Sequence, residues 1–322
     1  MPYDTSLIII SGLPRSGTSW LGKIFDSHPG VLYRHEPDTV IPMKWLPLVV
    51  ENNYGDYQAH LRGFVTQLPD IRDPKVSASL PFFFKSYMQP ARNVLVSHFL
   101  RFVKMVALSG VPVRVPRFSL PPKNRDYVLT WKTIESSGRL GFFAETLDRA
   151  RIVHILRHPG GVIASCLRGY ALNKFNGYDL AEDDEFFDLW CNSAAGLSHG
   201  LSLAQFKAMS PVERHAWLCV LPMQQTLKDI EGRKNCRVVL YEELCARPAA
   251  VTRQLLDFCG LDFDSQTRRF LAASTSKTDN RYFSVFKDSA ISAKKWKTEL
   301  DAKAQQEIKN VLNQSNLADL WR

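Results

Sequence analysis

The sequence lacks the patterns that mark zinc proteins, redox proteins and secreted proteins. Its six cysteines are Cys166, Cys191, Cys219, Cys236, Cys245 and Cys259. They form no CxxC pair and have no histidine at zinc-ligand spacing, so we expect reduced thiols and no metal site. The N-terminus, MPYDTSLIIISG, has neither the basic segment nor the long apolar segment of a secretory signal. These absences favour a cytoplasmic protein.

Long apolar runs and an excess of acidic residues are also missing. The longest apolar stretch, Val94 to Val113, contains His98, Arg101 and Lys104, which make it too charged to span a bilayer. The chain has 41 Lys and Arg against 32 Asp and Glu, a net charge of +9. This balance favours an anionic ligand, a polyanion or a membrane surface. With 322 residues, of which 45% are hydrophobic, the chain is long enough to bury a full core.

Short β-branched runs alternate with segments of helical periodicity. The run from Leu7 to Ser11 predicts a strand, and Trp20, Leu21, Ile24 and Phe25 recur at helical spacing after it. Three later segments repeat the pattern. A strand at 127–131 precedes a helix that ends near 149, a strand at 152–156 precedes a helix at 160–168, and a strand at 237–241 precedes a helix at 248–259. Such alternation predicts an α/β fold, a parallel sheet flanked by helices on both faces.

Two stretches interrupt the alternation. Between about residues 38 and 125 we expect a mostly helical lobe inserted in a single domain of residues 1–322, which would bind the acceptor. Within it, Leu95, Phe99, Phe102, Val103 and Val106 form one helical face, which either packs on the core or belongs to a lobe that attracts acidic substrate. The second stretch, residues 171–210, is expected to be a mobile surface segment.

The first loop carries the clearest functional signal. The segment from Gly12 to Ser19, GLPRSGTS, has the spacing of the phosphate-binding loop G-x-x-x-x-G-K-[ST] and lies between a strand and a helix. Thr18 stands where the lysine is expected, so a triphosphate is poorly served. Arg15 instead offers a planar fork suited to a group such as a phosphosulfate.

The run PRSGTSWL at residues 14–21 resembles the phosphosulfate loop of the sulfotransferases that use 3′-phosphoadenosine-5′-phosphosulfate (PAPS). The resemblance implies a P-loop-type α/β fold and a PAPS donor, with 3′-phosphoadenosine-5′-phosphate (PAP) as product. It also implies the residues that hold the 5′-phosphosulfate: Arg15, Ser16, Gly17, Thr18 and Ser19, with Trp20 beside them.

Three further segments resemble elements of the same family. The run LRHPGGVIAS is similar to the 3′-phosphate element, which implies that Arg157 and Ser165 bind that phosphate. Tyr241, in VLYEEL, resembles a tyrosine near the adenine. The segments 282–288 and 294–297 resemble the cover over the nucleotide, which implies contacts from Lys294, Lys295, Trp296 and Lys297. A nucleotide lid needs such stacking and positive charge.

The acceptor's proton requires a base. The branch of the family that acts on phenols and steroids has a histidine in a Lys-Thr-His element, but here the residue after Lys132 and Thr133 is Ile134. The segment SHPGVLYRHEP resembles the carbohydrate-type branch instead, which implies that Glu36 is the base. His35 is the competing base, because its ordinary pKa suits neutral pH. Lys132 is a candidate contact to the sulfuryl group.

The predicted function is therefore sulfuryl transfer from PAPS to a hydroxyl, or as second choice an amine, of a small-molecule, glycan or lipid-linked acceptor, without a metal. A rival interpretation is a P-loop kinase that uses ATP and acts on a small molecule, with Arg15 replacing the missing lysine. A basic module that binds nucleic acid or glycan ranks last, because no nucleic-acid-reading motif is present.

Overall fold

Five parallel strands form one sheet in the computed structural model, which describes residues 6–50, 55–122, 127–175, 177–276, 279 and 281–321. The strands are β1 (Leu7–Ser11), β2 (Val31–His35), β3 (Val128–Lys132), β4 (Arg151–Leu156) and β5 (Cys236–Leu240), in the order β2-β3-β1-β4-β5. The central strand β1 pairs Ile10 with Lys132 on one side and with Val153 on the other. The predicted parallel sheet is confirmed.

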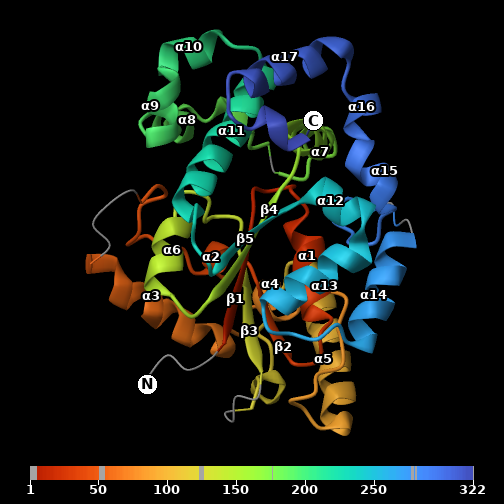
Figure 1. The fold of residues 1–322 in the computed structure, drawn as a ribbon. Helices are drawn as coiled ribbons and strands as arrows, with labels where there is room; N and C mark the ends of the chain where they lie inside the picture. The colour runs from red at the N-terminus through yellow and green to blue at the C-terminus, as the bar shows by residue number, and fades with distance from the viewer. Residues whose placement is uncertain are drawn as a thin grey trace.

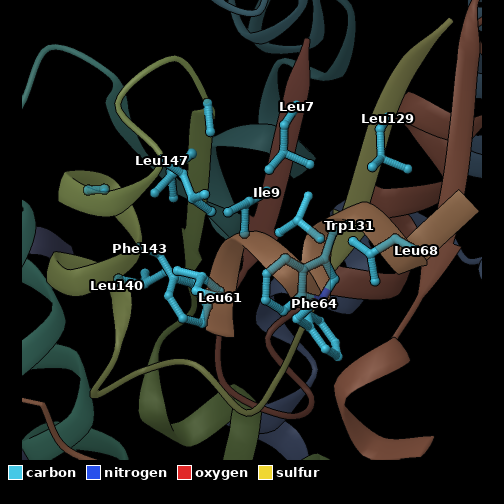
Figure 2. Packing of buried hydrophobic residues seen from close by; sticks show 14 of the residues in the cluster. Leu7, Ile9, Leu61, Phe64, Leu68, Leu129, Trp131, Leu140, Phe143 and Leu147 are labelled. Carbon is cyan, nitrogen blue, oxygen red and sulfur yellow. The ribbon is translucent and has the colours of Figure 1, made fainter. Parts of the chain in front are cut away.

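Alternate residues of β1 enter two separate cores. Leu7 and Ile9 pack with Trp131 and α3 on one face of the sheet, as Figure 2 shows. Ile8 and Ile10 pack on the other face with α1. Because side chains of a strand point alternately to its two faces, a strand that is apolar at every position needs a cover on both sides. The run LIIIS, buried throughout, meets this condition.

The helices form two layers on the sheet and a third group beyond its carboxyl end (Figure 1). The first face is covered by α3 (Gly55–Gln67) and α6 (Leu140–Thr146), and the second by α1 (Thr18–Asp26), α12 (Tyr241–Ala246), α13 (Pro248–Phe258) and α14 (Ser265–Ser276). The third group has its own apolar core and comprises α7 (Pro159–Ala171), α8 (Asp184–Cys191), α9 (Ala194–His199), α10 (Leu203–Ala208), α11 (Pro211–Ile230) and α17 (Ala302–Asn313).

Shorter helices join these layers. They are α2 (Pro37–Val40), α4 (Pro74–Ser77), α15 (Ser289–Lys294) and α16 (Trp296–Glu299), with 3-10 turns η1 (Leu68–Asp70), η2 (Arg117–Ser119), η3 (Leu180–Glu182) and η4 (Ala318–Trp321). The long helix α5 (Pro90–Leu108) lies at the periphery, in orange in Figure 1. Among the described residues, no helix is both long enough and apolar enough to cross a membrane.

Two expectations about the interrupted stretches are wrong. Residues 171–210 contain three α-helices whose Phe187, Trp190 and Phe206 are buried, so the described part of this stretch is a packed layer. In α5, Leu95 and Phe99 are exposed rather than buried, because a different stripe of this helix faces the protein. The described part of the inserted stretch, 38–50 and 55–122, is helical as expected, and its role as an acceptor lobe stays a prediction.

Candidate active site

The candidate site residues meet at the carboxyl edge of the sheet. The loop from Gly12 to Gly17 follows β1, and Glu36 follows β2. Thr133, Arg157 and Tyr241 follow the other three strands directly. In open parallel sheets, ligands bind outside the carboxyl ends of the strands where the strand order reverses, here next to the central β1. The topology thus gathers segments far apart in the sequence.

The loop after β1 requires glycine and leaves polar groups without partners. Gly17 has φ +94°, and a Cβ there would lie 2.5 Å from Cδ2 of Tyr241. Gly17 also caps α1, and no side chain in the described part of the chain accepts hydrogen bonds from the first N–H groups of that helix. The Ser16 hydroxyl is fully buried and has no hydrogen-bond partner among the described residues. Free N–H groups, a helix N-terminus and a buried hydroxyl together suit an anion.

Arg15 turns from the loop toward the second predicted element. Its backbone has φ +69°, and its Nε donates a 3.0 Å hydrogen bond to Oγ of Ser165 on α7. The guanidinium lies 4.3 Å from the ring centroid of Tyr282. Burial, with neighbouring Arg157, lowers its pKa. The structure therefore brings Arg15 and Ser165 together, although the sequence assigned them to different phosphates.

The remaining residues of the loop lie where α1 begins. Thr18 is buried and Ser19 is half-buried at the first positions of the helix. Trp20 donates a 3.0 Å hydrogen bond from Nε1 to Oγ of Ser274, which fixes the start of α1 against α14. Its ring also meets that of Tyr241 edge-on, 6.1 Å between centroids.

Arg157 lies beside the loop at the end of β4. One of its terminal nitrogens donates to the carbonyl of Arg15 at 2.8 Å, and the other donates to the carbonyl of Ser292 at 3.1 Å. Its Nε is buried without a partner. The guanidinium lies 4.4 Å from the ring centroid of Tyr241. Arg157 is therefore held in place and keeps a donor available.

Lys287 is a third cation beside Arg15 and Arg157, and the sequence analysis did not name it as a site residue. Burial and the neighbouring Arg15, Arg168 and Arg157 lower its pKa to about 8. Its Nζ donates to the carbonyl of Tyr282 at 3.2 Å. Among the described residues, no carboxylate lies within ion-pair distance of Arg15, Arg157 or Lys287. The signal for Lys287 was present, because segment 282–288 was expected to cover the nucleotide.

The predicted cover also lies over this region. Trp296 stacks on His158, the residue after Arg157, with 4.3 Å between ring centroids. Lys297 places its Nζ 5.7 Å from the Trp296 ring centroid, whereas Lys295 pairs with Glu299 at 3.1 Å. Lys294 is exposed at the end of α15. The stacking is thus present around Trp296, and the contacts of these lysines with a nucleotide stay predictions.

The end of the described chain is joined to the same loops. Glu242 accepts a 3.0 Å hydrogen bond at Oε1 from the backbone N–H of His158. Its other oxygen accepts from Nε1 of Trp321, also at 3.0 Å. The Trp321 ring meets that of His158 edge-on. One carboxylate therefore connects the loop after β4, the helix after β5 and η4.

Glu36 lies on the other half of the edge among basic groups. Lys132 Nζ forms an ion pair with its Oε1, and Lys75 Nζ lies 3.2 Å from its Oε2. Burial raises the pKa of Glu36, but Lys132, His35 and Lys75 outweigh it and lower this pKa to about 2. Burial, with nearby Lys132, lowers the pKa of His35 to about 3. Near neutral pH Glu36 is thus a carboxylate and His35 a neutral imidazole.

Asp38 is a buried acid that the sequence analysis did not single out. Its Oδ1 accepts from Nε1 of Trp131 at 3.2 Å, and its Oδ2 accepts from the hydroxyl of Thr133. Burial raises its pKa to about 6, against the effect of these hydrogen bonds. Lys75, the other unexpected neighbour of Glu36, comes from α4, about 40 residues further along the chain. Neither residue carries a local motif that could have revealed it.

A comparison with known protein families gives a match that includes the loop after β1. A sequence profile described as "Sulfotransferase family" matches residues 7–265. Among curated protein sequences, none matches this chain.

Several solved structures similar to this chain are named sulfotransferases in their titles. The sulfotransferase domain from the curacin biosynthetic pathway is 14% identical, with 96% of this chain and 97% of that one covered and a TM-score of 0.46. Mouse sulfotransferase SULT7A1 complexed with PAP is 11% identical, with 98% and 87% covered and a TM-score of 0.48. The sulfotransferase from Alicyclobacillus acidocaldarius is 15% identical over 100% of both chains, with a TM-score of 0.41. These TM-scores are too low to carry an argument, so the assignment rests on the profile, which spans most of the chain. The chain belongs to the sulfotransferase family.

Proposed function

We propose that this protein transfers a sulfuryl group from PAPS to a hydroxyl of a small-molecule acceptor. The observation that carries the proposal is the cluster of Arg15, Arg157 and Lys287 without a carboxylate partner among the described residues, next to the free N–H groups of α1. Like charges held together in a partly buried place are costly unless an anion binds there. A donor with phosphates at two ribose positions supplies such charge.

Each phosphate group of the donor has its own residues in this proposal. The 5′-phosphosulfate would lie against Ser16, Gly17, Thr18 and Ser19, where the buried Ser16 hydroxyl lacks a partner. The 3′-phosphate would lie against Arg157 and Ser165, with Lys287 close by. Arg15 contacts Ser165 here, so it is within reach of both groups. The stacked Trp296 and the buried Tyr241 would flank the nucleotide.

In the proposed reaction the acceptor oxygen attacks sulfur, the bond from sulfur to the phosphate oxygen breaks, and PAP leaves. Glu36, a carboxylate at neutral pH, takes the proton of the acceptor. Lys132 now pairs with Glu36, and its release toward the sulfuryl oxygens would raise the basicity of that carboxylate as charge develops. The proposal includes no metal.

The acceptor in this proposal is a small molecule with a hydroxyl group. Retinol dehydratase, a similar solved structure, is described in complex with androsterone and PAP, and another of its structures with retinol and PAP. These titles concern that protein alone. A glycan or lipid-linked acceptor and an amine remain predictions from the sequence, as does the cytoplasmic location.

Calorimetry and turnover test this proposal together. We expect PAP to bind at least tenfold more tightly than AMP, and we expect labelled sulfate to move from PAPS to an acceptor in a panel of phenols, sterols, alcohols and saccharides. The rival kinase interpretation predicts turnover of ATP with magnesium and none of PAPS. Equal affinity for PAP and AMP would contradict the two-phosphate site.

A further inference from the structure

We propose that α5 and the segment after it dock on the surface of an anionic lipid bilayer. The first reason is the distribution of charge along the chain. Residues 74–125 contain no Asp or Glu and nine basic residues: Lys75, Lys85, Arg92, Arg101, Lys104, Arg114, Arg117, Lys123 and Arg125. The whole chain has 41 basic and 32 acidic residues, so outside this segment the two kinds are equal in number. The excess of basic residues therefore lies in this one segment of the sequence, in which Lys75 and Lys85 are paired with Glu36 and Asp26.

The second reason is the apolar surface of α5. Its buried residues form only a narrow stripe: Asn93, Val96, Leu100 and Val103. Most of the other apolar side chains of α5 are exposed, and the exposed fraction reaches 57% for Phe102, 63% for Met105 and 74% for Leu108. Single exposed apolar residues are ordinary, but a contiguous set on one helix marks an interaction surface. We call this set the α5 patch: Val94, Leu95, Phe99, Phe102, Met105, Leu108, Val111 and Phe118.

The α5 patch is continuous with the segment that follows the helix. The Phe99 and Phe118 rings pack edge-on with 5.0 Å between their centroids. Arg92 holds that segment in place, since its Nη2 donates to the carbonyl of Phe118 at 2.9 Å and to that of Leu120 at 2.8 Å. Apolar residues from two parts of the chain thus lie on one fixed surface.

Basic side chains are interspersed with the α5 patch and are not neutralised. Arg101, Arg114 and Arg117 are exposed, and none of them forms an ion pair with a described residue. A surface that is apolar and positive suits a partner that is apolar and negative, which is the character of the interface of an anionic bilayer. A second copy of this chain would bring the same positive charge against itself, because a two-fold interface pairs the same patch with itself.

Helix α5 adjoins the element that carries a neighbour of the base. It packs against α4, from which Lys75 extends. The Lys75 ammonium is the one that lies 3.2 Å from Glu36. Docking would therefore bring the base near the bilayer surface, where an acceptor dissolved in lipid is available. This last consequence rests on the proposed function, whereas the docking itself does not.

Co-sedimentation of the full chain with vesicles tests the docking. Vesicles of equimolar phosphatidylcholine and phosphatidylglycerol should sediment the protein, and vesicles of phosphatidylcholine alone should bind it at least tenfold more weakly. The double variant Phe102→Ser with Met105→Ser should weaken binding about tenfold through the loss of apolar burial. Arg101→Glu should weaken it by about fivefold or more, because each basic residue contributes at an anionic surface.

Two matched variants lie away from the α5 patch. Leu197→Ser replaces a residue on α9 that is 67% exposed, and Lys309→Glu reverses an exposed charge on α17. Both should sediment like the unmodified protein. Circular dichroism and thermal unfolding of every variant test whether the fold is retained.

Three results would overturn the proposal. One is absence of binding to the anionic vesicles. Another is equal weakening by Leu197→Ser and by the α5 variants. The third is a dimer, or a complex with duplex DNA, that forms through the α5 patch and dissociates in the α5 variants while vesicles leave the protein in the supernatant.

Discussion

The two halves of the carboxyl edge treat positive charge in opposite ways. Around the loop after β1, Arg15, Arg157 and Lys287 lie together without a carboxylate partner among the described residues. Around Glu36, Lys132 and Lys75 are both paired with one carboxylate. The first half is thus prepared to receive an anion from outside. In the second, which we call the ion-paired half, both cations already contact a carboxylate. A single edge can in this way bind a charged donor and still keep an ionised base beside it.

The largest expected effect concerns the ion-paired half, which contains Glu36. Glu36→Gln should reduce kcat by about 100-fold to 10,000-fold, because the acceptor's proton loses its base. PAP affinity, measured by calorimetry, should stay within threefold, since the donor is held by the other half. Glu135→Gln is the matched control, an exposed acid after β3, and should retain full activity. A rate near normal for Glu36→Gln would remove Glu36 from the mechanism and leave His35 or Asp38 as the candidate.

The cation-rich half should respond in binding. Arg157→Ala should weaken PAP binding by about 30-fold or more, because truncating a buried charged contact costs about 2 kcal/mol or more. AMP, which has no 3′-phosphate, should lose much less affinity. Isothermal titration with both nucleotides separates the effects. A parallel loss for PAP and AMP would mean that Arg157 supports the loop through the Arg15 carbonyl and does not contact the 3′-phosphate.

The backbone of the loop offers a smaller test of the same half. Gly17→Ala should lower the free energy of unfolding by about 2 kcal/mol or more, through left-handed strain and a collision with Tyr241. Gly260→Ala has a similar φ of +71° but nothing within 4 Å of the added Cβ. It should lose only about 1 kcal/mol. Urea denaturation compares the two, and equal losses would show that Tyr241 yields to the methyl group.

The smallest effect is in the pH dependence of kcat/KM, which reports on the ion-paired half. Glu36, with a pKa of about 2, is protonated only far below neutral pH, so kcat/KM should stay level from about pH 7, where Lys287 is still charged, down to about pH 5. Lys75→Met removes a cation that lowers this pKa, so the acid limb should move to higher pH. Lys75→Arg keeps the charge and should keep the profile. A limb near pH 6 in the unmodified enzyme would point to Asp38 instead.

Local spacing explains what the sequence could predict. The loop at residues 12–19 and the run LRHPGGVIAS are each contiguous, so their strand, turn and helix were readable, and the sheet followed from their repetition. Lys75 and Asp38 were not found, because their importance depends on contacts between segments that are distant in sequence. The strand β2 was missed because VLYRH ends in the polar residues Arg34 and His35, whereas LIIIS, of equal length, is apolar up to its last residue.

The error in α5 has a different physical cause. This helix is apolar on several sides, so periodicity could not decide which stripe faces the protein. In the structure the stripe of Val96, Leu100 and Val103 packs inward, and Leu95 and Phe99 are left outside. Amphipathic periodicity identifies a buried face only when the opposite face is polar.

The bond between Trp321 and Glu242 has a practical consequence for anyone who produces this protein. Glu242 also accepts a hydrogen bond from the amide of His158. Trp321, the last residue that the structure describes, is therefore linked through one carboxylate to the loop that carries Arg157. A purification handle fused after residue 322 would emerge immediately beside that indole. By contrast, β1 begins at Leu7, at the end of the strand opposite the loop that holds Arg15.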